Sequence, residues 1–420
     1  MCDCCSRFSD TLHYSSPAHG GWGVVRTAML VPESYQLFVS PFACGRHGAI
    51  GACCQGLKQR LSYLYLQEAD IVSGSYEELI PEAVTELLAA LSTKPKVLLI
   101  FVSCLDDLLG TDHEAILALL REQHPEVRFV FCHMNPISLG SRLPPPVHVQ
   151  LKMYSLLEKQ PGAKTQAVNF VGNMVPVDER SELYSVLQTL GIPAVRHISQ
   201  YTAFDRWQEM AASRLNVVLL PPGLRAAEDM QARLGIPYLD LPVSYDPDEI
   251  LASYEQLAQA LDKALTVDLS RHYQQAVCAL RDTAEALAGV PIVLDGSCSA
   301  RPFSLALALL KYGFVVAEVM ADDAGSDGEG LERLLQSYPQ VRLTQPQHHS
   351  TVLFDRRQPE VLAIGFDAGY ITGARHVAGL VSDEGMFGFW GVERLMEMLR
   401  AAWAEETDLQ QMIDAYGLVV

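Results

Sequence analysis

The stretch KVLLIFVSCLDDLLGTDHEAILALLREQHPEVRFVFC, residues 96–132, decides the fold class of this chain. Residues 96–104, with an unbroken apolar run at 97–102, predict a buried strand. The spacing of apolar residues over 112–123 predicts an amphipathic helix, and 127–132 predicts the next strand. A strand, a helix and a second strand in this order are typical of a parallel sheet covered by helices.

The same alternation of strands and helices returns twice along the chain. A second series begins with a predicted strand at 167–172 and includes another at 216–220. A third series begins at 291–296 and reaches a strand at 360–366, and the helical stretch 246–288 links it to the second series. The sequence therefore predicts an α/β protein.

We expect three Rossmann-like parallel-sheet domains around a central cleft. We place the N-terminal α/β domain at residues 1–160, a second domain with the linking helices at 161–288, and a third domain at 289–420. In open α/β sheets, ligands gather at the carboxyl ends of the strands. Three such edges would converge on one cleft.

The composition excludes several classes of protein. The chain has 420 residues, of which 49% are hydrophobic and 19% charged, as in globular proteins. Its net charge of −19 argues against nucleic acid and anionic membranes as partners, because phosphate groups would be repelled. The longest apolar run, VLLIF with its neighbours, is too short to span a bilayer, and the start MCDCCSRFSD lacks the basic and hydrophobic regions of a secretory signal. We expect a cytoplasmic protein.

The chain contains ten cysteines, which we expect to be mostly reduced in that compartment. Cys132, at the end of an apolar strand pattern, and Cys278, in a helical pattern, are predicted to be core residues. Cys104 closes the strand at 96–104, and Cys44 ends an apolar run just before a glycine. Both positions suit a ligand, but for each of them a place in the core stays open.

The segments around these two cysteines resemble a known family. PAHGGWGVVR, VSPFACGRHG, QEADIVSGSYEEL and FVSCLDDLLGTD follow one another as in the amino-terminal third of the nitrogenase component 1 superfamily. Members of that superfamily have a cysteine segment, then a strand that ends in a second cysteine, then an acidic turn. Here Cys44 and Cys104 stand 60 positions apart, and Gly110-Thr111-Asp112 follows where the turn is expected. DEGMFGFWGVERLMEML resembles the closing helix of the family, so the resemblance extends over the chain.

The resemblance implies an iron–sulfur cluster held by thiolates between two subunits. Cys44 and Cys104 are the implied ligands. The third cysteine of some members would fall near Ser16, so a symmetric dimer with two ligands from each chain would hold one [4Fe-4S] cluster. This arrangement is similar to that of the short, homodimeric nickel-sirohydrochlorin reductive cyclases. Ser16 and Cys5, in the N-terminal CDCC segment, are additional candidate ligands.

The stretch YSSPAHGGWGVVR also resembles the B subunit of dark-operative protochlorophyllide reductase. That likeness makes His19 and Arg26 candidates for residues near the cluster, although a helix cap and a surface arginine stay open as alternatives. Reduction also needs proton donors beside the reduced bond, and His19 and His47 are the candidates for that role.

Two ligands of the nitrogenase catalytic subunits are missing from this sequence. Those subunits hold their large metal cofactor with a cysteine in the second domain and a histidine near the closing helix. Here the corresponding segments read LLPPG (219–223) and GMFG (385–388), with Phe387 in place of the histidine. We therefore do not expect a dinitrogen-reducing subunit. The cleft is expected to hold a different metal cofactor or a tetrapyrrole.

The resemblance thus predicts a nitrogenase-like catalytic component. Low-potential electrons would come from an ATP-dependent [4Fe-4S] reductase and pass through the cluster between subunits to a small-molecule or tetrapyrrole-like substrate. The partner subunit would be an identical or a homologous chain. Two alternatives stay open, namely a scaffold on which a metal cofactor is assembled and a small-molecule binding protein without metal.

Overall fold

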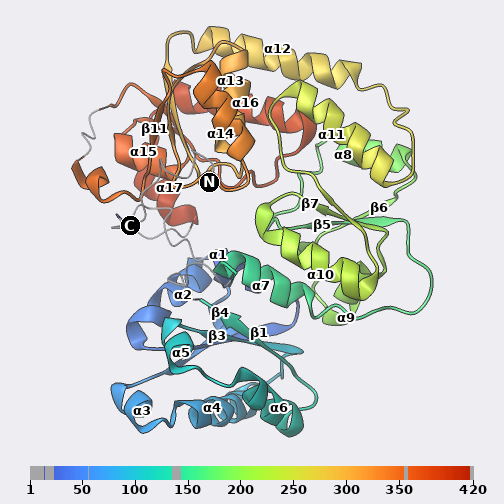
Figure 1. The fold of residues 1–420 in the computed structure, drawn as a ribbon, viewed down its shortest axis with the longest axis vertical. Helices are drawn as coiled ribbons and strands as arrows, with labels where there is room; N and C mark the ends of the chain where they lie inside the picture. Colours follow the sequence, from blue (N-terminus) through green and yellow to red (C-terminus); the bar gives the residue numbers. More distant parts are fainter. Residues whose placement is uncertain (1–13, 15–22, 55, 135–142, 354–357, 417–420) are drawn as a thin grey trace.

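The chain folds into three parallel sheets with helices packed on them (Figure 1). This computed structural model describes residues 14, 23–54, 56–134, 143–353 and 358–416. The predicted α/β class is confirmed, since every strand pair in the three sheets is parallel. No helix in the described ranges combines the length and apolar character needed to span a membrane.

The N-terminal sheet has the order β2-β1-β3-β4. Its strands are β1 (Ser34–Ser40), β2 (Leu61–Tyr65), β3 (Val97–Val102) and β4 (Arg128–His133). The helices around it are α1 (Gly23–Ala28), α2 (Phe42–Cys54), α3 (Glu68–Ser73), α4 (Tyr76–Ala90), α5 (Cys104–Leu109), α6 (His113–Gln123) and α7 (Pro145–Tyr154), with the 3-10 turn η2 (Lys58–Arg60).

The second sheet has the order β6-β5-β7-β8. Its strands are β5 (Ala167–Val171), β6 (Ala194–Arg196), β7 (Leu215–Val218) and β8 (Tyr238–Asp240). The helical elements here are α8 (Leu183–Thr189), η3 (Ile198–Gln200), α9 (Phe204–Trp207), η4 (Gln208–Ala212), η5 (Pro221–Gly223) and α10 (Leu224–Leu234), followed by the linking helices α11 (Pro247–Ala260) and α12 (Ser270–Ala286).

The third sheet has the order β11-β10-β9-β12-β13. Its strands are β9 (Pro291–Asp295), β10 (Val315–Met320), β11 (Arg342–Thr344), β12 (Leu362–Ile364) and β13 (His376–Ala378). The helical elements are α13 (Pro302–Lys311), α14 (Gly328–Ser337), η6 (His349–Leu353), α15 (Phe366–Thr372), α16 (Gly388–Ala404) and α17 (Leu409–Tyr416).

The burial of strand β3 explains why its sequence has no polar position. All six of its residues are buried, because helices cover both faces of the sheet. Leu98 and Ile100 pack in a core with residues of α4 and α6. Leu99 and Phe101 point the other way and pack in a core that also contains Trp207 of the second unit.

Hydrophobic cores therefore continue from one sheet to the next. The core that contains Phe101 joins the first and second units, and the largest core contains both Phe170 of β5 and Leu294 of β9. Apolar cores of this kind fix the three units against one another. These cores include residues from both sides of the predicted domain boundaries near residues 160 and 288. The boundaries therefore remain predictions.

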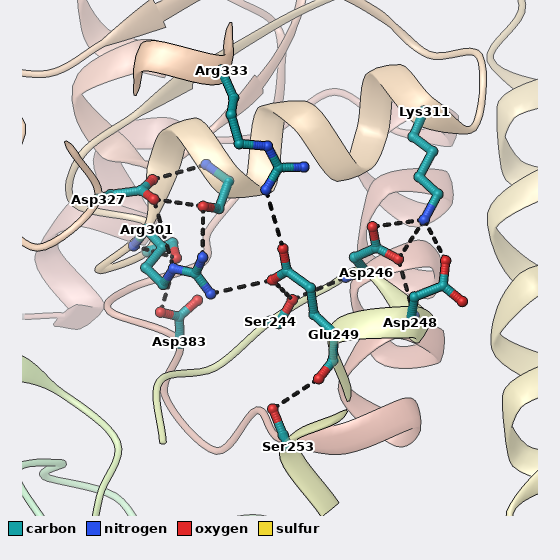
Figure 2. Close-up of polar contacts among 12 residues, drawn as sticks. Ser244, Asp246, Asp248, Glu249, Ser253, Arg301, Lys311, Asp327, Arg333 and Asp383 are labelled. Carbon is teal, nitrogen blue, oxygen red and sulfur yellow. Dashed lines mark hydrogen bonds and ion pairs between the residues drawn. The ribbon is translucent and has the colours of Figure 1, made fainter. Parts of the chain in front are cut away.

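A set of ion pairs joins the start of α11 to the third unit (Figure 2). Lys311 Nζ lies 2.8 Å from Asp246 and 2.7 Å from Asp248, and Arg301 Nη1 lies 3.3 Å from Glu249 Oε2. Exposed ion pairs each contribute little to stability. Several pairs from two elements nevertheless orient α11 on the third sheet.

Candidate functional site

Cys44 and Cys104 lie at the same edge of the N-terminal sheet. Strands β1 and β3 are neighbours, with Val39 opposite Val102 at their carboxyl ends. Cys44 lies in the first turn of α2, where its backbone N–H donates to the carbonyl of Pro41 at 3.0 Å. Cys104 is the first residue of α5, directly after β3. The prediction that both cysteines follow strand ends is confirmed, and adjacent strands bring the two residues together.

The two thiols are close enough to influence each other. Burial raises the pKa of the Cys44 thiol above its ordinary value, and a charge on Cys104 raises it further. Neither cysteine forms a disulfide; Cys44 is exposed and Cys104 is half-buried. Thiolates are soft ligands that suit iron–sulfur clusters, so the chemistry of this pair fits such a group.

A [4Fe-4S] cluster takes four thiolates, and this edge offers two. Within the described ranges, no group of three or more His, Cys, Asp or Glu side chains is arranged to hold a metal ion. The two thiols therefore fit one half of a cluster site, which leaves the other ligands to come from elsewhere.

Exposed apolar side chains lie on the segments that follow the same strand ends as the candidate cysteines. Phe42 on α2 is 66% exposed, Val72 on α3 is 81% exposed and Leu108 on α5 is 82% exposed. Tyr65, at the end of β2, is also exposed, and its ring centroid lies 5.1 Å from that of Phe42. All four residues belong to segments at the carboxyl ends of β1, β2 and β3, as the cysteines do. Exposed apolar residues gathered in this way are typical of a protein–protein contact.

Three histidines form a row at the neighbouring strand end, and sequence reasoning missed them. His113 Nε2 lies 2.7 Å from Asp106 Oδ2, and the His113 ring centroid lies 4.9 Å from that of His133. The His133 and His148 centroids are 5.0 Å apart, and the backbone N–H of His133 donates to His148 Nδ1 at 3.4 Å. One signal was present in the sequence, since His133 ends β4 just as Cys104 follows the end of β3.

Burial keeps two of these histidines neutral near pH 7. It lowers the pKa of His148 to about 4, with further contributions from His133, Lys152 and His113. Burial also lowers the pKa of His133, and the charges of His113 and Lys152 lower it further. Because Nδ1 of His148 accepts a hydrogen bond, the ring proton of the neutral form lies on Nε2.

Several predicted site residues cannot be placed. Cys5, Ser16 and His19 lie outside the described residues. His47 belongs to α2, but its side chain is not among those described. Their roles as ligands or proton donors remain predictions.

Arg26 forms an ion pair with the third unit, and its place near the cluster remains a prediction. Its guanidinium forms two hydrogen bonds with the carboxylate of Glu384 in the third unit, at 2.9 and 3.3 Å. This ion pair ties α1 of the first unit to the loop before α16.

The two predictions of core cysteines had different outcomes. Cys132 is fully buried in β4, which confirms that prediction. The prediction for Cys278 is wrong, because this residue is exposed on α12. Ala276 and Leu280 on the same helix are the residues that face the core.

A cavity of about 670 Å³ lies between the second and third units. Val175 to Arg180 form one wall, and the loop from Gly379 to Met386, together with α16, forms the other. Glu384 lies in this lining, so its ion pair with Arg26 brings the first unit to the cavity as well. Its described lining comes from the second and third units alone, so the expected cleft formed by all three sheet edges remains a prediction.

The described lining of the cavity is rich in charge. It includes Arg394 and Arg180. The guanidinium of Arg180 pairs with Asp178 at 2.7 Å, and its carbon atom lies 5.0 Å from the centroid of the Trp390 ring. No cysteine or histidine is among these lining residues. Asp178, Glu179 and Glu384 line it beside the two arginines, so the lining suits an organic molecule of mixed polarity better than a metal held by soft ligands.

Phe387 packs into the core and does not face this cavity. It is buried, with its ring centroid 6.5 Å from that of Phe170 and 5.9 Å from that of Tyr254. Phe387, which the resemblance sets in place of a histidine ligand, thus takes part in aromatic packing between the second and third units.

Comparison with known proteins gives one consistent result. A family model described as nitrogenase component 1 type oxidoreductase matches residues 21–403. The solved structure "Nitrogenase Cp1 at pH 6.5" is similar with a TM-score of 0.72 and 16% identity, covering 94% of each chain. "Nitrogenase Cp1 at pH 5" is similar with a TM-score of 0.65 and 15% identity, covering 94% of this chain and 89% of that one. No match was found among curated proteins. At these identities the two structures support the fold alone.

Proposed function

This chain belongs to the nitrogenase component 1 type oxidoreductases, and from that premise we propose that it is the catalytic component of a nitrogenase-like reductase. Electrons come one at a time from an ATP-dependent [4Fe-4S] reductase. They pass through a [4Fe-4S] cluster between two subunits and reduce a small organic molecule or a tetrapyrrole-like substrate. Dinitrogen is not its substrate.

The pair of thiols carries this proposal. Cys44 and Cys104 stand together at one sheet edge and supply half the ligands of a cubane cluster. The exposed apolar residues on α2, α3 and α5, namely Phe42, Val72 and Leu108, give a second chain a surface to cover. A symmetric dimer formed through this surface brings four thiolates together. A homologous partner with its own cysteines would do the same.

The chain's own residues have distinct roles in this proposal. Cys44 and Cys104 hold the cluster, which when bound accepts and donates single electrons at low potential. His133 and His148 form a partly buried row at the neighbouring strand end, where burial keeps both rings neutral, so they can donate ring N–H hydrogen bonds but carry no acid proton near pH 7. His19 and His47 stay the candidate proton donors.

The cavity between the second and third units is the proposed substrate site. Arg180 and Arg394 line it, and because each is already paired with a carboxylate of the chain, Asp178 and Glu397, a carboxylate at the edge of a tetrapyrrole would compete with these ion pairs. The lining and the buried Phe387 give no support to a second metal cofactor held by cysteine or histidine.

Iron and sulfide analysis after anaerobic purification tests the cluster. We expect about four iron atoms per two chains, and Cys44→Ala or Cys104→Ala should remove most of them. Cys278→Ala is the matched control, because this exposed cysteine on α12 lies in a different unit and should leave the iron content unchanged. An iron-free wild-type protein would refute the proposal and favour the metal-free binding protein.

A second experiment separates the enzyme from an assembly scaffold. An enzyme should stimulate ATP hydrolysis by its reductase and oxidise the reduced reductase repeatedly when the substrate is added. A scaffold should instead release a metal cofactor once and show no repeated turnover.

A further inference from the structure

Two buried hydroxyl groups lie at the edge that carries the candidate cysteines. Ser40 is the last residue of β1 and is 0% exposed; Ser103 directly follows β3 and is 5% exposed. Because Val39 pairs with Val102, the two serines are the next neighbours in register. Neither hydroxyl has a hydrogen-bond partner in the structure as described. A buried hydroxyl without a partner is costly and calls for an acceptor.

Helix capping does not account for Ser103. It occupies the N-cap position of α5, where a serine side chain normally accepts a hydrogen bond from the backbone of the first turn. Ser103 makes no such bond. Asp112, at the N-cap of the next helix, does cap, because its carboxylate accepts from the N–H of Ala115 at 3.0 Å. The Ser103 hydroxyl is therefore free for an acceptor beside Cys104.

Ser40 faces the turn that carries Cys44. A methyl group built on Gly45, the residue after Cys44, would lie 3.3 Å from Ser40 Oγ. The hydroxyl thus lies directly beneath the first turn of α2. Each candidate cysteine consequently has one unpartnered serine hydroxyl next to its own backbone.

We propose that Ser40 and Ser103 donate hydrogen bonds to the cysteinyl sulfur atoms of Cys44 and Cys104 when these hold a cluster, and so set its reduction potential. This inference rests on the proposed function. Cysteinyl and inorganic sulfur atoms accept hydrogen bonds, and such bonds stabilise the more negative, reduced state of a cluster. The two serines therefore make the cluster easier to reduce, and act through its sulfur atoms without binding iron.

The test is a redox titration of the loaded protein followed by electron paramagnetic resonance. Ser40→Ala and Ser103→Ala should each move the midpoint to a more negative potential. A tenfold loss in the equilibrium constant of reduction corresponds to about 59 mV for one electron. Ser103→Thr keeps the hydroxyl and should titrate like the wild type.

Ser34→Ala is the matched control. It removes a buried hydroxyl from the opposite end of β1, where Ser34 Oγ donates to the carbonyl of Val31 at 2.7 Å. This variant should lose stability without changing the potential. Ser40→Ala and Ser103→Ala should not lower the thermal stability of the iron-free protein, because no hydrogen-bond partner of either hydroxyl is found among the described residues.

The outcomes distinguish this inference from the proposed function. A wild-type protein without iron would remove the proposed function itself. Full iron content with unchanged potentials in both alanine variants would overturn the role of the serines alone, as would destabilisation of the iron-free variants to the extent seen for Ser34→Ala. Loss of iron from Ser103→Ala with retention in Ser103→Thr would also overturn it, because that pattern marks a hydroxyl that binds iron.

Discussion

Replacing Glu182 by alanine should lower the free energy of unfolding by about 4 kcal/mol. This side chain is 5% exposed and joins the second unit to the third. Its Oε1 accepts the hydroxyl of Tyr254 at 2.6 Å and the N–H of Phe389 at 2.7 Å, and Oε2 accepts the N–H of Trp390 at 3.1 Å. Phe389 and Trp390 lie in the first turn of α16, so the carboxylate also meets the positive end of that helix.

The magnitude follows from these contacts. Alanine leaves three donors without an acceptor, at about 1 kcal/mol each if water partly fills the space, and removes about 1 kcal/mol of charge–helix attraction. Glu182→Gln keeps one acceptor oxygen at nearly the same volume and loses the charge, so we expect about 2 kcal/mol. Tyr254→Phe removes one donor and should cost less in the Glu182→Ala background than in the wild type.

Urea unfolding of the iron-free protein, followed by tryptophan fluorescence, measures these differences. Glu397→Ala is the control, because its ion pair with Arg394 is exposed and should contribute less than about 0.5 kcal/mol. Losses below about 1 kcal/mol for Glu182→Ala, or equal losses for the alanine and glutamine variants, would refute this account of the carboxylate.

Other substitutions test the remaining packing and charge. Burial lowers the pKa of His148 from 6.5 to about 4, so the unfolded chain binds this proton more tightly than the folded chain. The wild type should therefore lose about 2 to 3 kcal/mol of unfolding free energy as the pH falls from 6.5 to 4. His148→Asn should remove this loss, as measured by unfolding at pH 4 to 8. An equal slope in wild type and variant would contradict this. Gly223→Ala should lower the free energy of unfolding in urea by about 1 to 3 kcal/mol, because the new methyl group would lie 2.5 Å from the Cα of Gly172. The control Gly191→Ala meets no neighbouring atom and should cost about 1 kcal/mol, because its backbone is left-handed. Phe387→His should lower the melting temperature without adding bound metal, because it buries an imidazole among aromatic rings; a gain in metal content would show that this position reaches a cofactor site.

The sequence alone determined the features that depend on local pattern. A strand buried on both faces must be apolar throughout, which is why 97–102 could be recognised without neighbours. Ligands of α/β folds gather at strand ends, so Cys44 and Cys104 were recognisable from their positions and from their resemblance to a family. The resemblance likewise predicted from the sequence that two nitrogenase ligands are missing, with Phe387 in place of one of them.

Only the tertiary structure decided which side chains meet. His113, His133 and His148 come from α6, β4 and α7, and only the packing of these elements places their rings in one row. Sequence periodicity also put Cys278 on the wrong face of its helix, because the direction of the core depends on which elements pack against that helix.

The serine hydroxyls show the same limit most clearly. Ser40 and Ser103 are ordinary residues at strand ends in the sequence, and either could have capped a helix. The register of β1 against β3 sets them side by side, and the burial of both leaves two hydroxyls without partners beside two thiols. Hydrogen-bond satisfaction depends on every neighbour in space, so a one-dimensional pattern cannot reveal it.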